Sequence, residues 1–147
     1  MKYNLIALLF LFSCNVKTVK DDPQALSLQG TWQLISGTTI AKGDSTFTDY
    51  TKDQSMIKII NGTHFAFLKH PVNNDTINKF DAGGGRYMLN GDQYTEHLDY
   101  YNNKNWEGQT FTFTVSISND TLTQQGVEKV EGEGVDHVII EKYVRVK

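Results

Sequence analysis

Strict alternation of apolar and polar residues over Gln109–Ser118 is the feature that most constrains this fold. Successive side chains of a β-strand point to opposite faces, so the alternation predicts an antiparallel strand with one buried and one solvated face. No segment after Gln29 shows a sustained period of 3.6 residues, which a helix would require. The apolar face consists of Phe111, Phe113, Val115 and Ile117. The chain is therefore predicted to be all-β.

Tight-turn dipeptides separate further candidate strands. Asn61-Gly62, Asn90-Gly91 and Asn119-Asp120 each lie between short apolar runs, and their residue types tolerate the positive φ of hairpin turns. For the first hairpin we expect Ile57, Ile59, Phe65 and Phe67 to share one face. About eight to nine short strands at this spacing predict a closed antiparallel barrel or a sandwich, and closure would remove the exposed edges.

Composition narrows the class of protein. The 147 residues suggest one domain, and a net charge of -3 with 21% charged residues argues against a nucleic-acid partner. The single cysteine excludes an internal disulfide and a cysteine-based zinc cluster. We expect no cofactor.

The amino terminus is typical of a targeting segment. Lys2 precedes the apolar run Leu5–Phe12, which is too short to span a bilayer and has the length of a signal-peptide core. Leu11-Phe12-Ser13-Cys14 resembles a bacterial lipobox, which implies removal of residues 1–13 and acylation of Cys14. Residues 14–28 would then be the lipidated cysteine and its tether. The resemblance implies a membrane-anchored protein of the bacterial cell envelope, in the outer membrane; the alternative is an ordinary secretory signal and a secreted protein.

Gly30-Thr31-Trp32 opens the first predicted strand, after the short apolar stretch Ala25–Leu28. This resembles the G-x-W signature of lipocalins and their calycin relatives, over about residues 29–147. The resemblance implies an up-and-down barrel of about eight strands, preceded by a short helical turn. It also implies that Trp32 packs at one end of the barrel under Arg145. Alternatively, Tyr143 and Arg145 face the lumen, similar to the inward Arg-x-Tyr pair of fatty-acid-binding proteins, although the order here is reversed.

One face of the hairpin around Asn90-Gly91 is the candidate ligand-binding surface. It carries Tyr87, Leu89, Tyr94, Glu96, Leu98 and Tyr100. We expect this face to point inward because it is richer in apolar area. The three tyrosines would stack against a ligand, and Glu96 would accept a hydrogen bond or pair with a cation. The alternative is a solidly packed aromatic core.

Catalytic and metal-binding motifs are missing from the sequence. The four histidines have no H-x-H or H-x-x-x-H spacing, and no serine lies in a G-x-S-x-G elbow. We therefore expect no metal site and a non-enzymatic, envelope-anchored lipocalin-like protein that binds a small apolar or amphipathic molecule. The alternatives are a structural or interaction lipoprotein with a filled barrel, and an enzyme on the same barrel with Glu96 as acid or base.

Overall fold

The computed structural model describes residues 27–72 and 80–147. The predicted signal peptide, Cys14 and the tether up to residue 26 lie outside the described residues. Residues 27–29, the described part of the segment just before the first strand, are not helical, and residues 25 and 26 lie outside the description. No helix in the described ranges is long and apolar enough to cross a membrane.

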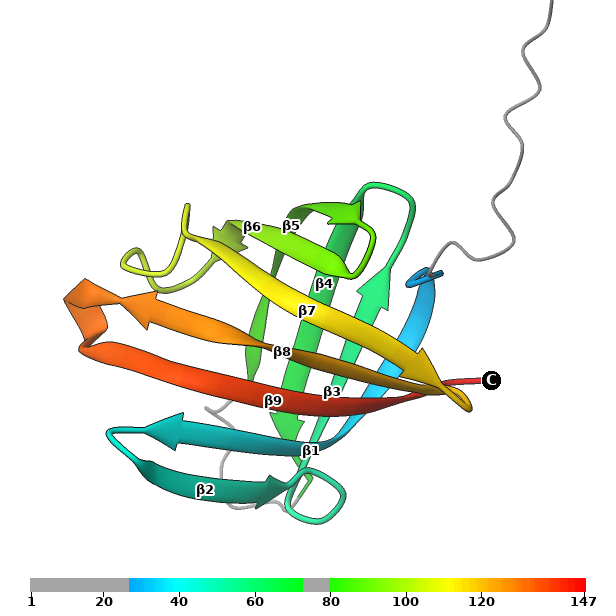
Figure 1. Cartoon of the computed structure of the whole chain (residues 1–147), viewed down its shortest axis with the longest axis horizontal. Coiled ribbons are helices and arrows are strands. Elements are labelled where there is room, and N and C mark those ends of the chain that lie inside the picture. Colours follow the sequence, from blue (N-terminus) through cyan, green and yellow to red (C-terminus); the bar gives the residue numbers. More distant parts are fainter. Residues whose placement is uncertain (1–26, 73–79) are drawn as a thin grey trace, which may run out of the picture.

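The described chain folds into nine strands and one short 3-10 helix (Figure 1). The strands are β1 (Gly30–Ala41), β2 (Asp44–Asp49), β3 (Gln54–Ile60), β4 (His64–Pro71), β5 (Asp81–Asn90), β6 (Gln93–Tyr101), β7 (Thr110–Ser118), β8 (Thr121–Val130) and β9 (Val135–Arg145). The helix η1 (Glu131–Glu133) lies between β8 and β9. This all-β content confirms the class predicted from the alternating pattern.

The sheet closes on itself through β1. Neighbouring strands from β3 to β9 pair antiparallel in chain order, and β9 pairs with β1. Strands β2 and β3 share one position in the wall, because β2 pairs with Ser36–Ala41 of β1 and β3 pairs with Gly30–Gln33. The result is the predicted closed, antiparallel eight-stranded barrel of lipocalin-like form.

The turns show which predicted strand pairings are right and which are shifted. Asn119 and Asp120 have φ values of 49° and 60°, and Ile117 pairs with Leu122, as the predicted turn at Asn119-Asp120 requires. In the β5–β6 hairpin, Asn90 itself pairs with Gln93, so the two-residue turn is Gly91-Asp92 rather than Asn90-Gly91. Because the turn lies one residue later than predicted, the residues of β5 nearest the turn pair with residues of β6 two positions further along the chain than expected. A shift of two residues keeps the same side chains on the same face.

The predicted register of the β3–β4 hairpin is wrong. Ile60 pairs with Phe65, so Lys58 and Phe67 face one another on the inner side, and Ile59 is 42% exposed on the outer side. The cause is the turn: the side-chain carboxamide of Asn61 accepts hydrogen bonds from the backbone of Thr63 and His64, which lengthens the loop by one residue. A slip of one residue exchanges the two faces of a strand.

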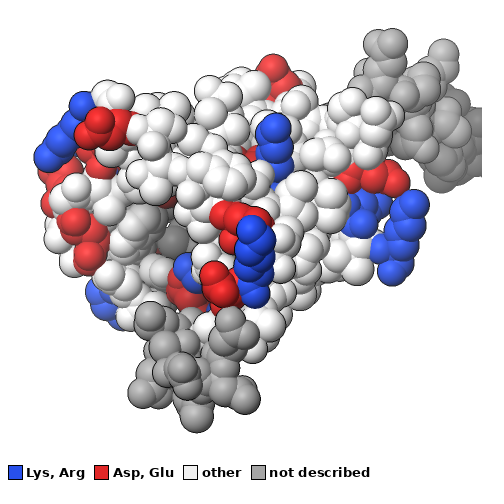
Figure 2. Space-filling model, turned by 90° about the horizontal axis from the view of Figure 1, so that it is seen from below, with Lys and Arg blue, Asp and Glu red and all other residues white. Residues whose placement is uncertain are grey.

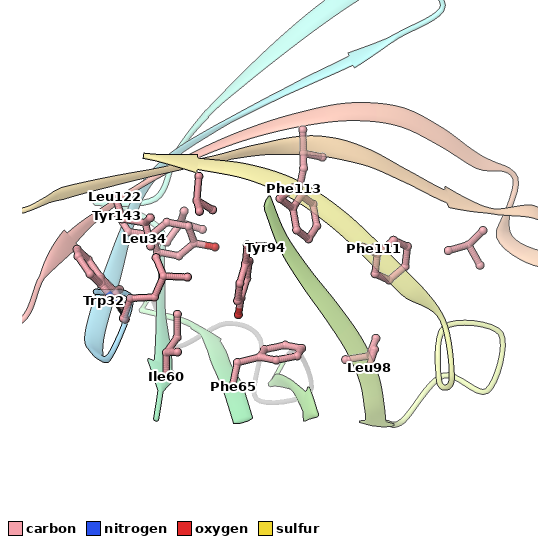
Figure 3. Close-up of a cluster of buried hydrophobic side chains, with 14 residues drawn as sticks. Trp32, Leu34, Ile60, Phe65, Tyr94, Leu98, Phe111, Phe113, Leu122 and Tyr143 are labelled. Atoms are coloured by element: carbon pink, nitrogen blue, oxygen red, sulfur yellow. Dashed lines mark hydrogen bonds between the residues drawn. The ribbon is translucent and has the colours of Figure 1, made fainter. Parts of the chain in front are cut away.

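The end of the barrel at which β1 begins is closed by apolar side chains (Figure 3). Trp32 and Leu34 are fully buried, and the indole nitrogen of Trp32 donates a hydrogen bond of 2.8 Å to the carbonyl of Leu28. The Arg145 guanidinium lies 4.0 Å from the centre of the Trp32 ring. It also donates to the carbonyls of Gln29 at 2.7 Å and Ser27 at 3.3 Å. Arg145 thus ties the last strand to the start of the first.

Candidate functional site, a cavity in the barrel

A cavity of about 290 Å³ lies inside the barrel, toward the end away from Trp32. This volume is close to the lower limit of about 300 Å³ for typical small-molecule sites. Its lining residues come from most strands of the wall and from the loop between β6 and β7. Figure 2 shows a hollow on one face of the molecule with acidic and basic side chains at its edge. The interior is therefore not filled completely by side chains.

The floor of the cavity is a buried ion pair. The Lys58 ammonium, on β3, lies 2.6 Å from a carboxylate oxygen of Glu96 on β6 and 3.0 Å from the side-chain oxygen of Gln124 on β8. The side chains of Lys58 and Glu96 are only 3% and 9% exposed. Burying either charge alone would be very costly, so each group depends on the other.

The same network continues to β9. The Gln124 amide donates to a carboxylate oxygen of Glu141 over 3.4 Å, and the Tyr143 hydroxyl donates to that same oxygen over 2.6 Å. Burial raises the pKa of Glu141, while the charge of Lys58 and the hydrogen bond from Tyr143 oppose the rise. Burial also raises the pKa of Tyr143, which keeps this hydroxyl protonated as a donor. The network joins four strands that are not all neighbours in the wall.

Three aromatic rings surround the Lys58 ammonium. Phe65, Tyr94 and Tyr143 have ring centres at 5.5, 5.6 and 5.6 Å from it, within range of cation–π attraction. The Tyr94 hydroxyl is buried and has no hydrogen-bond partner among the described residues. Burial, and next the negative charge of Glu96, raise its pKa. The rings hold the lysine chain in place and separate it from the apolar closed end.

A second acidic group lies nearer the open end. A carboxylate oxygen of Glu128, on β8, lies at a hydrogen-bond distance of 3.1 Å from the His137 ring on β9. Burial raises the pKa of Glu128, and the contact with His137 opposes this. Lys69 and Asp81 form a further ion pair of 3.0 Å that also lines the cavity. The polar side of the cavity thus extends from its floor toward its opening.

A row of aromatic rings also lines the cavity. Ring centres are 5.9 Å apart for Phe67 and Tyr101, 6.3 Å for Tyr101 and Trp106, and 5.8 Å for Trp106 and Phe111. These separations are those of favourable tilted and edge-to-face aromatic pairs. Trp106 comes from the loop between β6 and β7 and is half-buried. One surface of the cavity can therefore stack on a flat or apolar group while the other offers charges.

The predicted ligand-binding residues have different positions in the structure. Tyr94 and Glu96 point into the barrel, but Tyr94 lies beneath the cavity and only Glu96 lines it. Tyr87 is half-buried and donates a hydrogen bond of 2.7 Å to the carbonyl of Asn61, in the β3–β4 turn. Tyr100 is 69% exposed, so its predicted inward position is wrong. Tyr101 lines the cavity in its place.

A β-bulge explains the exchange of Tyr100 for Tyr101. Gly84 pairs with Tyr100 and Arg86 pairs with His97, so two residues of β6 oppose Gly85 alone. The extra residue reverses the alternation along the rest of β6. A Cβ atom on Gly85 would lie 1.9 Å from the carbonyl oxygen of His97, so the bulge needs glycine at this position.

The last strand combines the predicted Trp32–Arg145 stack with an inward Tyr143, whereas an inward Arg145 is not observed. Tyr143 points into the barrel and is fully buried, whereas Arg145, on the same face of β9, reaches the closed end and stacks on Trp32. Glu141 shares this face and joins the polar floor. The reversed order of tyrosine and arginine places the guanidinium outside the cavity, so no arginine carboxylate clamp forms there.

Several residues of the site could not be identified from the sequence. Lys58 stands among isoleucines, and the register expected for its hairpin placed it outside. A buried Glu96 needs a cationic partner, and that need is the one signal that could have identified a lysine within an apolar strand. Other lining residues that were missed include Gln124, Glu128, Glu141 and Trp106.

Comparison with known proteins agrees with the fold. The structure of a lipocalin-like protein from Bacteroides uniformis superposes with a TM-score of 0.51 and 22% sequence identity, covering 81% of this chain and 98% of that one. A point mutant of the fluorescent protein UnaG gives a TM-score of 0.40 and 11% identity over 82% of this chain and 96% of that one. No protein-family model matches the chain, and no curated protein matches it. The chain has a lipocalin-like fold.

Proposed function

We propose that this protein binds a small, partly apolar molecule inside its barrel. The main support for this proposal is the cavity of about 290 Å³, which is lined by both aromatic and polar side chains. A barrel serving only as a scaffold could fill its lumen with side chains, as its closed end does. Concave sites with apolar walls and a few fixed polar groups are the usual form of small-molecule sites.

The polar floor supports a binding role for a second reason. Lys58, Glu96, Gln124 and Glu141 are joined by hydrogen bonds of 2.6, 3.0 and 3.4 Å. A ligand that meets such a preorganised surface orders few side chains on binding, which lowers the entropic cost of association. The aromatic side supplies the apolar area that drives the ligand out of water.

Occupancy of the cavity can be tested with a neutral fluorescent probe, N-phenyl-1-naphthylamine. Met56 lines the cavity, whereas Met88 is 60% exposed on the outer face, and the two residues provide a matched pair. Met56→Trp fills part of the cavity and should abolish the increase in probe fluorescence. Met88→Trp adds the same side chain outside and should leave binding unchanged.

The result counts only if both variants keep the circular dichroism spectrum of the parent. Equal loss of probe binding in both variants, or no saturable binding by the parent protein, would contradict the proposal. Probe binding that survives Met56→Trp would place the probe outside the cavity and would contradict it as well.

We further propose that the barrel is held at a bacterial membrane through an acylated Cys14. Support comes from the lipobox-like residues Leu11–Cys14 and from the polar stretch that follows them. Intact mass measurement of the protein expressed with its full sequence in a Gram-negative host tests this. We expect the mass of the chain without residues 1–13 plus attached acyl groups, and detergent-dependent solubility. Cys14→Ser should release an unacylated protein; an unchanged mass shift in this variant would refute the proposal.

A further inference from the structure

We propose that the ligand of this cavity is a cationic amphiphile, with an amine or ammonium group at the carboxylate of Glu141 and an aromatic or apolar body against the aromatic rings that line the same cavity. This inference rests on the proposed binding function and specifies the chemical class of the ligand. It follows from which of the charged side chains that line the cavity are already in ion pairs.

The charges that line the cavity are unequal in number. Its described lining residues include two lysines and four acidic side chains. Lys58 is paired with Glu96 at 2.6 Å, and Lys69 is paired with Asp81 at 3.0 Å. Both cationic chains are therefore engaged. The two remaining acidic residues are Glu128 and Glu141.

Glu141 is the acidic group without a cation of its own. Within the described part of the chain its hydrogen bonds come from two neutral donors, the Tyr143 hydroxyl and the Gln124 amide, and both reach the same oxygen, Oε2. The other carboxylate oxygen accepts no hydrogen bond from the described residues. The negative charges of Glu128 and Glu96 add to burial in raising the pKa of Glu141. A cation in the cavity would relieve this repulsion and give the carboxylate a charged donor.

Glu128 faces the same space with one oxygen engaged. Its Oε2 contacts the imidazole of His137 at 3.1 Å. Glu128 lies four residues beyond Gln124, the cross-strand partner of Glu141, so the two carboxylates are separated along the strands. Glu128 therefore acts on an ammonium group at Glu141 through its charge rather than as a shared acceptor. The oxygen of Glu141 that lacks a donor would accept the hydrogen bond from the ammonium group.

The aromatic wall suits the rest of such a ligand. Phe67, Tyr101, Trp106 and Phe111 form a continuous row of ring contacts that lines the same cavity as the acidic residues. Aromatic faces attract cations as well as apolar groups, so this wall does not oppose a positive charge nearby. An anionic ligand would meet two carboxylates in the same cavity while both lysines are already paired.

Three small ligands that share one aromatic body test the inference. Phenethylamine is cationic at neutral pH, phenethyl alcohol is neutral and hydrocinnamate is anionic. Trp106 lines the cavity and Trp32 is buried at the closed end, so quenching of tryptophan emission, absent in Trp106→Phe, reports binding. We expect the amine to bind about tenfold or more tightly than the alcohol, and the anion to bind least.

Charge-neutral variants then assign the preference to residues. Glu141→Gln should reduce affinity for the amine to about that of the alcohol while affinity for the alcohol stays within about twofold. Glu128→Gln provides a second variant with the same expected direction if Glu141→Gln does not fold. Glu131→Gln makes the same change on the exposed 3-10 helix and should leave all three affinities unchanged.

The outcomes separate this inference from the proposed function. Binding of the alcohol without preference for the amine, or tighter binding of the anion, overturns the cationic assignment but leaves ligand binding intact. A preference for the amine that is equal in the parent and in both cavity variants also overturns it. Failure of all three ligands and of N-phenyl-1-naphthylamine overturns both proposals.

Discussion

Replacement of Lys58 by methionine tests the physical argument for the polar floor. Methionine keeps most of the length and volume of the side chain but removes the ammonium group, so Glu96, whose side chain is only 9% exposed, loses its partner at 2.6 Å. Loss of one member of a buried pair costs about 3–5 kcal/mol, because the other charge remains out of water. We expect the free energy of unfolding to fall by this amount. That is a large part of the total of about 5–15 kcal/mol for such a domain.

Urea denaturation followed by tryptophan fluorescence measures the change. The double variant Lys58→Met with Glu96→Leu removes both charges, and we expect it to lie within about 1–2 kcal/mol of the parent, since apolar replacement of a whole pair is often neutral. Lys69→Met removes the cation of a pair whose side chains are 32% and 24% exposed. It should cost less than about 1 kcal/mol. The reasoning fails if Lys58→Met costs no more than Lys69→Met, or if the double variant is as unstable as Lys58→Met alone.

Three further predictions concern the frame that holds the cavity. Arg145→Ala removes the guanidinium from the buried indole and should cost about 1–3 kcal/mol in urea, with Arg145→Lys recovering only part because ammonium cannot stack as a plane. Gly85→Ala places a Cβ atom 1.9 Å from a backbone oxygen and should abolish cooperative unfolding or soluble yield, whereas Gly62→Ala, with nothing within 4 Å, should behave like the parent. Hydrogen bonds from Arg86 lower the pKa of Asp99 from 3.8 to about 2. The charged form of Asp99 therefore stabilises the fold above about pH 3.8, and this stabilisation is lost as the pH falls through about 2. The Tm of Asp99→Asn should therefore lie below that of the parent near neutral pH and converge with it in acid; a constant difference at all pH values would contradict this.

The barrel could be predicted because strands such as β7 have one apolar face and one polar face. Over Thr110–Ser118 every inward position is apolar and every outward position polar, so only one register buries the right face. The pairing across the Asn119-Asp120 hairpin that follows could also be predicted, because a two-residue turn there pairs Ile117 with Leu122. Resemblance to the G-x-W signature added the closed end, where Trp32 is fully buried.

Prediction failed where both faces of a strand are apolar or where the backbone adds a residue. The segment Gln54–Ile60 has Met56 and Ile60 on one face and Ile57 and Ile59 on the other, so hydrophobic pattern does not select the inward face. The Asn61 turn and the bulge opposite Gly85 each shift a register by one residue, and neither leaves a clear trace in the hydrophobic period. The polar floor depends on the Asn61 turn, which places Lys58 on the inner face, and the aromatic row depends on the bulge, which brings Tyr101 into the cavity.

The methionine methyl groups offer the most direct test that the barrel interior is a ligand site. The described residues include Met56, which lines the cavity, and Met88, which lies on the outer face. In a spectrum of the protein labelled with carbon-13 at the methionine methyls, titration with phenethyl alcohol or N-phenyl-1-naphthylamine should move the Met56 signal saturably and leave the Met88 signal in place. Movement of the Met88 signal alone, or no saturable movement of either, would contradict the account.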